Sequence, residues 1–258
     1  MIPKKIHYCW FGRGKKPKMA LRCVKSWEKF CPNYEIVEWN EDNFDVNCCE
    51  YTKEAYKAKK YAFVSDYARY QILYKNGGVY FDTDVELIRA IDDIVEKGNF
   101  MGYETDGSNF ADRIQSPMYT GEVNPGLGIA AVPGLHIYKE ILDYYHTLNF
   151  IMSDGSLNTK TVVAYTTEIL LKHGMKDMRE IQKVDGIWIY PKEYFNPRNN
   201  NTGKLEITKN TKSIHWYSMS WLPKHKAMLV NVTRICHRLF GEDCFSRLKE
   251  IINNRNKE

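Results

Sequence analysis

The chain has 258 residues, which allows one full domain or one domain with a modest appendage. Hydrophobic residues make up 43% of the chain, aromatic residues 14% and charged residues 27%, a composition that excludes disorder, collagen and coiled coil. The formal net charge is only +5, and the body of the chain lacks the basic stripe with stacking aromatics expected of a nucleic-acid-binding protein.

Predicted strands and helices alternate along the chain. In chain order, hydrophobic periodicity predicts a strand at 6–11, a helix at 19–30, a strand at 34–39, a long helix at 52–75, strands at 79–86, 99–104 and 126–132, helices at 136–148 and 161–173, a strand at 186–190 and a polar loop or hairpin at 191–212. Gly77 and Gly78 end the long helix, because glycine tolerates the left-handed backbone of a helix C-cap. This order predicts an α/β fold with a mostly parallel central sheet.

The cysteines and the apolar runs indicate the compartment. Seven cysteines are an odd number without any Cys-x-x-Cys pair, which fits neither a zinc ribbon nor a complete disulfide framework. The longest uncharged apolar runs are shorter than the roughly 18–20 residues of a membrane span, and no signal peptide is evident. We therefore expect a cytoplasmic protein.

One boundary divides the chain near residue 223. Residues 224–258 hold eight Lys/Arg against four Asp/Glu, whereas the rest of the chain carries a net charge of about +1. We predict a main domain at 1–222 and a helical extension at 223–258, in which apolar residues recur at helical spacing from Met228 to Phe240. This basic amphipathic helix either lies peripherally on the anionic inner face of the cell membrane or docks on the main domain or a second copy.

The strongest chemical signal is a group of carboxylates after the long helix. Asp66 and Arg69 lie three residues apart on one face of that helix. On the following strand the side chains alternate, which puts one polar set on the face opposite the core: Tyr80, Asp82, Asp84 and Glu86. Carboxylates so close repel each other unless a cation such as Mg²⁺ or Mn²⁺ lies beside them, and these ions commonly bind substrate phosphates as well. The pattern favours a nucleoside-diphosphate site over a solvated acidic turn.

Four ordered blocks carry a family resemblance that covers most of residues 2–221. They are Ile2 to Gly12, Tyr34 to Asn40, Ala62 to Glu86, and the closing pairs His215-Trp216 and Ser220-Trp221. In these blocks the chain resembles the Asp-x-Asp glycosyltransferases of family 32, especially bacterial capsular-polysaccharide transferases, and distantly the large clostridial glucosylating toxins. The resemblance implies a GT-A-type nucleotide-binding sandwich at 1–222 that uses a sugar nucleotide and Mn²⁺ or Mg²⁺, with retention of anomeric configuration.

The same resemblance implies roles for individual residues. Asp66 and Arg69 would hold the donor sugar, Asp82 would contact the ribose and the sugar, and Asp84 would ligate the metal. The implied sets are Asp66, Arg69, Asp82 and Trp221 for catalysis, Trp10, Tyr80, Asp82 and Ser220 for donor binding, and Asp82, Asp84 and His215 for the metal.

Several of these assignments have structural alternatives. Trp10 follows the first strand, where its ring can stack on the donor base or simply fill the core. His215 is either a metal ligand or a packed histidine, and His7 is expected to be structural. The loop 115–124 either faces the acceptor or is an ordinary surface loop, and the sequence does not decide whether a carboxylate nucleophile takes part.

The leading hypothesis is a retaining, metal-dependent transferase. It moves a hexose or N-acetylhexosamine, galactose or glucose type favoured, from a UDP-sugar to a glycan acceptor in capsular or other surface polysaccharide synthesis, with a polyprenyl-diphosphate-linked acceptor as one form. The alternatives are a GDP-mannose-dependent mannosyltransferase and a catalytically silent sugar-nucleotide-binding subunit. A phosphohydrolase is disfavoured, because no second cluster of metal ligands is visible.

Overall fold

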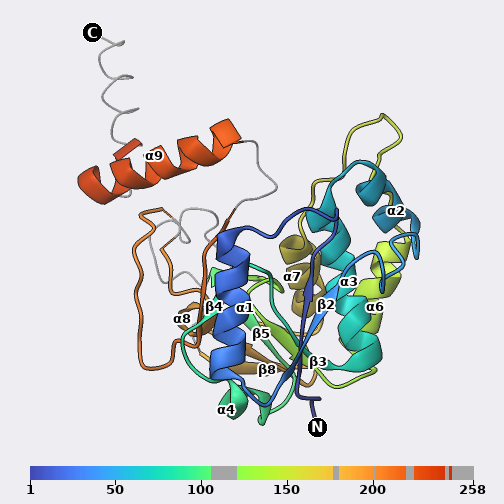
Figure 1. Cartoon of the computed structure of the whole chain (residues 1–258), viewed down its shortest axis with the longest axis horizontal. Helices are drawn as coiled ribbons and strands as arrows, with labels where there is room; N and C mark the ends of the chain where they lie inside the picture. The colour runs from blue at the N-terminus through green and yellow to red at the C-terminus, as the bar shows by residue number, and fades with distance from the viewer. Residues whose placement is uncertain (106–120, 177–179, 200, 219–223, 242–243, 246–258) are drawn as a thin grey trace.

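The computed structural model describes residues 1–105, 121–176, 180–199, 201–218, 224–241 and 244–245 (Figure 1). Its centre is a sheet in the order β2-β1-β3-β7-β5-β9-β8, with β6 paired to β5. The strands are β1 (Lys5–Cys9), β2 (Glu35–Trp39), β3 (Gly78–Tyr80), β5 (Phe100–Thr105), β6 (Glu122–Val123), β7 (Ile129–Ala131), β8 (Gln182–Val184) and β9 (Ile187–Tyr190). Five of these eight strands, β1, β2, β3, β5 and β9, run in one direction. The predicted α/β fold with a mostly parallel sheet is confirmed, although β7 enters antiparallel between β3 and β5.

Helices cover both faces of this sheet (Figure 1). They are α1 (Lys18–Phe30), α2 (Glu50–Lys57), α3 (Tyr61–Asn76), α4 (Asp92–Val95), α6 (His136–His146), α7 (Val162–Lys172) and α8 (Lys192–Phe195), with α9 (Lys224–Phe240) beyond them. Alternation along β1 separates two cores, because Ile6 and Tyr8 pack with the α1 side while Cys9 packs with the α3 side. The result is a helix–sheet–helix sandwich, and no helix in its described part is long and apolar enough to cross a membrane.

The predicted long helix at 52–75 is in fact two helices. α2 ends at Lys57 and α3 begins at Tyr61, with Lys59 in the left-handed region at φ 58°. The amide of Lys60 donates to the carbonyl of Ala55, which satisfies a terminal carbonyl of α2 while the chain changes direction. Hydrophobic spacing continued across the break, so periodicity alone did not reveal it.

The predicted strand at 79–86 is also interrupted, and the interruption builds the site. β3 ends at Tyr80, and the amide of Val85 donates to the carbonyl of Asp82 over 3.0 Å, which closes a tight turn. β4 (Val85–Leu87) then leaves the central sheet and pairs antiparallel with β10 (Ser213–His215), with His215 opposite Val85. A turn, rather than strand alternation, therefore gathers the two carboxylates, and it brings a late segment of the chain beside them.

Two further expectations concern the second half of the chain. The predicted loop at 191–212 contains the short helix α8, and its Asn199–Gly203 turn is closed by a hydrogen bond from the Gly203 amide. The predicted helix from Met228 is present as α9, displaced from the sandwich in Figure 1. Residues 219–223 lie outside the described residues, so the domain division at 222–223 stays a prediction.

Gly77 ends α3 in a conformation that only glycine adopts readily, with φ 63° and ψ −165°. A β-carbon there would lie 2.6 Å from Cδ of Pro133 and 2.9 Å from the carbonyl oxygen of Ala131. We expect Gly77→Ala to lower the free energy of unfolding by about 2 kcal/mol or more, measured by urea titration. Gly14→Ala is the matched control, because nothing lies within 4 Å of its added carbon; equal stabilities of the two variants would contradict the prediction.

Candidate active site

Three segments far apart in the sequence meet at the carboxyl end of β3. Helix α3 supplies Asp66 and Arg69, the turn after β3 supplies Asp82 and Asp84, and β10 supplies His215. In open α/β sheets this end of the strands is where ligands bind. The structure therefore brings together five of the residues that the sequence predicted for the site.

The buried side chain of Arg69 links the helix to the turn. Its Nη2 lies 2.8 Å from Oδ1 of Asp66 and 3.2 Å from Oδ1 of Asp82, and its Nε donates to the carbonyl of Ser65. The guanidinium carbon also lies 5.0 Å from the ring centre of Tyr80, whose hydroxyl donates to Asp82 over 3.0 Å. Because Arg69 is only 3% exposed, these partners are what make its burial tolerable.

The carboxyl groups of Asp66 and Asp82 ionise less readily than that of Asp84. Burial raises the pKa of Asp66 to about 7, although Arg69 acts in the opposite direction. Burial and the nearby Asp84 also raise the pKa of Asp82, again against the attraction of Arg69. One guanidinium thus serves two carboxylates, and the site retains an excess of negative charge that attracts a cation.

Asp84 and His215 lie within hydrogen-bond distance of each other. Nε2 of His215 lies 3.0 Å from Oδ1 of Asp84, and the amide of Ser218 donates to Oδ2 over 2.8 Å. Burial opposes ionisation of Asp84, but His215 and the Ser218 amide outweigh it and hold the pKa of Asp84 well below its usual range. Burial likewise opposes protonation of His215, but the neighbouring Asp84 raises its pKa.

These residues fit a divalent cation. One ligand atom from each of Asp82, Asp84 and His215 can be chosen so that all three lie within 4.8 Å of one another. Nδ1 of His215 is buried and has no hydrogen-bond partner in the part of the chain that the structure describes. Two carboxylate oxygens and an imidazole nitrogen are donors that suit Mn²⁺, while Mg²⁺ relies on the oxygens.

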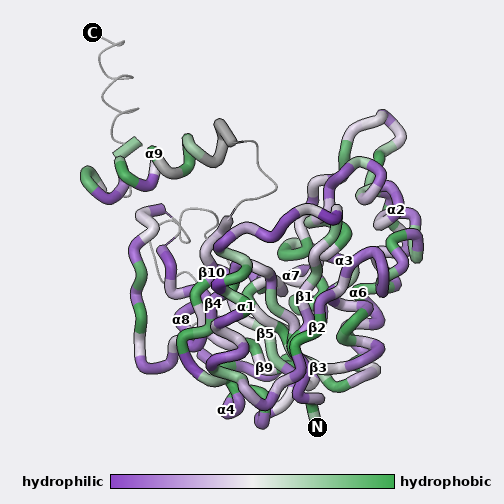
Figure 2. Tube along the Cα trace, viewed as in Figure 1, coloured by the Kyte–Doolittle hydropathy of each residue, from purple (hydrophilic) through white to green (hydrophobic). Residues whose placement is uncertain are grey.

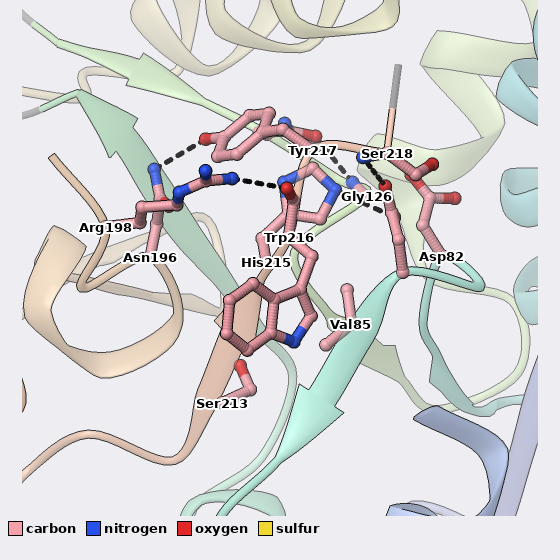
Figure 3. Close-up of polar contacts among 12 residues, drawn as sticks. Asp82, Val85, Gly126, Asn196, Arg198, Ser213, His215, Trp216, Tyr217 and Ser218 are labelled. Atoms are coloured by element: carbon pink, nitrogen blue, oxygen red, sulfur yellow. Dashed lines mark hydrogen bonds and ion pairs between the residues drawn. The ribbon is translucent and has the colours of Figure 1, made fainter. Parts of the chain in front are cut away.

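Tyr217 and Ser218 belong to the site, and the sequence did not single them out. Tyr217 takes a left-handed backbone at φ 50°, which turns the chain so that the Ser218 amide reaches Asp84. Figure 3 shows its hydroxyl pointing to Asn196, whose side-chain nitrogen donates to it over 2.6 Å. The centre of the Tyr217 ring lies 4.1 Å from the centre of the His215 ring. A backbone role of this kind leaves no trace in side-chain patterns, although both residues lie between the predicted pairs His215-Trp216 and Ser220-Trp221.

Gly126 allows Asp82 to approach the neighbouring loop. A β-carbon at Gly126 would lie 2.1 Å from Oδ2 of Asp82, and the amide of Asp82 donates to the Gly126 carbonyl over 3.1 Å. Asn124, the last residue of the predicted acceptor loop, accepts from the Gly126 amide over 2.7 Å and donates to Glu104 over 3.0 Å. Residues 106–120 lie outside the described residues, so the acceptor role of the loop stays a prediction.

The other predicted residues have different positions. Trp10 lies just beyond β1 at the same end of the sheet, half-buried, with its ring N–H donating to the carbonyl of Gly14. Glu86, predicted to share the face of Asp82 and Asp84, instead pairs with Arg22 and accepts from the ring of Trp216. His7 is buried and bonded to the Gly77 carbonyl, as a structural residue would be. Ser220 and Trp221 lie outside the described residues, and the donor roles of Trp10 and Tyr80 stay predictions.

The raised pKa of Asp66 gives a pH prediction. The folded chain binds a proton that the unfolded chain releases as the pH rises from about 4 to about 7, so wild-type stability falls across that window. We expect Asp66→Asn, which does not ionise, to be nearly equal to wild type in stability at pH 4 and more stable by about 4 kcal/mol at pH 8. Three pKa units correspond to about 4 kcal/mol, and this shift already includes the attraction of Arg69. Urea titrations at both pH values test this, and a difference independent of pH would contradict it.

The contact of Gly126 with Asp82 gives a second prediction. Gly126→Ala should displace the Asp82 carboxylate and weaken Mn²⁺ binding at least about tenfold, or about 1.4 kcal/mol. Titration calorimetry with Mn²⁺ measures the change. Gly14→Ala again serves as the control, and Mn²⁺ affinities that match in the two variants would refute the proposed role of the contact.

Comparison with known proteins agrees with this geometry. Residues 17–101, which include Asp66, Arg69, Asp82 and Asp84, match the glycosyltransferase sugar-binding region containing the DXD motif. Inositol phosphoceramide mannosyltransferase 3 of Schizosaccharomyces pombe is 30% identical over 102 residues, which cover 36% of this chain and 27% of that protein. An uncharacterised glycosyltransferase of Acanthamoeba polyphaga mimivirus is 26% identical over 214 residues, 77% of each chain.

The fold likewise has a counterpart among solved structures. Mouse xyloside xylosyltransferase 1 in its apo form superposes with a TM-score of 0.51 at 10% identity, covering 84% of this chain and 99% of that chain. The sandwich is thus the GT-A type that the family resemblance implied. Residues 17–101 thus match the sugar-binding region of DXD glycosyltransferases, and the structure gathers both aspartates of that motif in one site with His215.

Proposed function

We propose that this protein transfers a hexose or N-acetylhexosamine from a nucleotide sugar, UDP favoured, to a glycan acceptor with retention of configuration. The observation that carries the proposal is the meeting of Asp82, Asp84 and His215 beside the buried Arg69. This arrangement offers a cation site with surplus negative charge at the ligand-binding end of the sheet. Such a site suits a metal-bridged diphosphate better than a free anion, which these carboxylates would repel.

Each part of the site has its own task in this proposal. A bound Mn²⁺ or Mg²⁺ would be held by Asp82, Asp84 and His215, and would supply charge stabilisation for the departing diphosphate. Arg69 fixes the Asp82 carboxylate and, with Asp66, borders the donor sugar. The turn at Tyr217 and Ser218 orients Asp84 through the Ser218 amide, which limits the reorganisation that substrate binding requires.

The donor base and the acceptor are proposed from the sequence and from one relative. A UDP-sugar and a surface-polysaccharide acceptor, including a polyprenyl-diphosphate-linked one, follow from the family resemblance of the sequence. A GDP-mannose donor is the second candidate, because the relative that is 30% identical over 102 residues is a mannosyltransferase by name. A catalytically silent subunit is disfavoured, since the described site keeps both aspartates, Arg69 and His215.

The test compares two neighbouring carboxylates. Asp84→Asn removes a ligand of the proposed cation site, whereas Glu86→Gln makes the same chemical change at a residue that faces Arg22 and Trp216 instead. We expect Asp84→Asn to lower kcat/KM for transfer at least about a thousandfold, or about 4 kcal/mol, with Glu86→Gln close to wild type. Products from UDP- and GDP-sugars in Mn²⁺ are separated and counted as transferred or hydrolysed sugar.

Donor binding is measured separately by thermal shift. The preferred nucleotide sugar should stabilise wild type by about 2.7 kcal/mol at a hundredfold excess over Kd, and only with Mn²⁺ or Mg²⁺ present. Selective stabilisation by GDP-mannose would replace the UDP assignment with the mannosyltransferase. Stabilisation by no nucleotide sugar, or full transfer by Asp84→Asn, would refute the proposal.

A further inference from the structure

Helix α9 exposes an unusual apolar stripe. Six large apolar side chains recur at spacings of one, three and four residues, and each is between 50% and 69% exposed: Met228, Leu229, Val232, Ile235, Leu239 and Phe240. Figure 2 shows apolar positions along this helix, which is set apart from the sandwich. A stripe packed on the main domain would be largely buried, so the structure does not support that alternative for the described part of α9.

The basic side of α9, not its apolar side, faces the protein. Nη2 of Arg238 donates to the carbonyl of Thr202 over 2.9 Å, and a β-carbon at Gly203 would lie 3.6 Å from both Arg234 and Arg238. Burial, with Arg234 and Arg238 nearby, lowers the pKa of Arg198. The helix is thus seated on the Arg198–Gly203 loop through its arginines, which turns the apolar stripe outward.

The charge of the C-terminal segment indicates which kind of partner covers the apolar stripe. Residues 224–258 carry eight Lys/Arg against four Asp/Glu, while the remaining chain is nearly neutral. Two copies meeting through this segment would bring like charges together, whereas an anionic lipid surface would attract them. An exposed apolar stripe combined with local positive charge is the pattern of a helix that lies in a membrane interface.

We propose that α9 docks on an anionic phospholipid surface, with its six apolar side chains inserted among the lipids and its arginine side held against the Arg198–Gly203 loop. Arg198 also donates to the carbonyl of Trp216, next to the metal-binding candidate His215. The same loop therefore supports both the membrane helix and the site segment, which sets the site near the surface where a lipid-linked acceptor would lie. The docking itself does not depend on the proposed transfer reaction.

The experiment uses the full chain and vesicle co-sedimentation. Vesicles of phosphatidylcholine alone are compared with vesicles that contain about 30% phosphatidylglycerol. The test variant Ile235→Glu/Leu239→Glu puts two acids into the stripe, and the control variant Leu21→Glu/Leu171→Glu makes the same changes at exposed leucines of α1 and α7. Melting temperatures of all three proteins should agree, because each substituted side chain is exposed.

We expect wild type and the control to bind the anionic vesicles and the test variant to bind at least about tenfold more weakly. Binding should also fall in high salt and with neutral vesicles, because screening and the loss of anionic lipid remove the electrostatic attraction. Equal binding by all three proteins would overturn the proposal. So would the absence of vesicle binding together with a dimer, seen by light scattering, that the test variant dissociates.

Discussion

The ion pairs of Arg69 with Asp66 and Asp82 are the constraint on which the site depends. A buried guanidinium is stable only when its charge is matched, so helix α3 and the turn after β3 must keep their mutual position. Tyr80 supports both groups, because its hydroxyl donates a hydrogen bond to Asp82 and its ring lies against the guanidinium of Arg69. The Asp82 carboxylate also lies close to the backbone of Gly126. Glycine is required there, because the carboxylate fills the space that a side chain would occupy.

The contact between Asp84 and His215 completes the site from the other end of the chain. Asp84 and His215 are 131 residues apart in sequence, and they meet because β4 leaves the central sheet to pair with β10. The two aspartates of the motif therefore differ in character. Asp84 is ionised by its histidine and the Ser218 amide, whereas Asp82 keeps a raised pKa beside one shared arginine. A cation bound between the two carboxylates would therefore lower the pKa of Asp82 more than that of Asp84.

The Arg198–Gly203 loop connects this chemistry to the C-terminal helix. On one side Arg198 holds the backbone of the segment that carries His215, and on the other side the carbonyl of Thr202 receives Arg238 of α9. Among the basic residues of the C-terminal segment, Arg234 and Arg238 of α9 lie next to this loop. One loop thus contacts both the segment that carries His215 and the arginine side of α9, whose apolar stripe is exposed.

The sequence alone determined the features that local rules control. The three-residue spacing of Asp66 and Arg69, the glycine at the end of α3 and most strands and helices follow from periodicity and backbone preference. The candidate metal ligands Asp82, Asp84 and His215 could be named from the family resemblance. Only the tertiary structure decided that Asp82 and Asp84 lie on a turn, that Lys59 breaks a helix, that Glu86 faces Arg22 and that Tyr217 directs a backbone amide to Asp84. The physical reason is that a local sequence pattern reflects only the burial and the helical or extended geometry of its own residues. A turn between two sheets, or a hydrogen bond between residues more than a hundred positions apart, depends on partners that lie outside any local stretch of sequence.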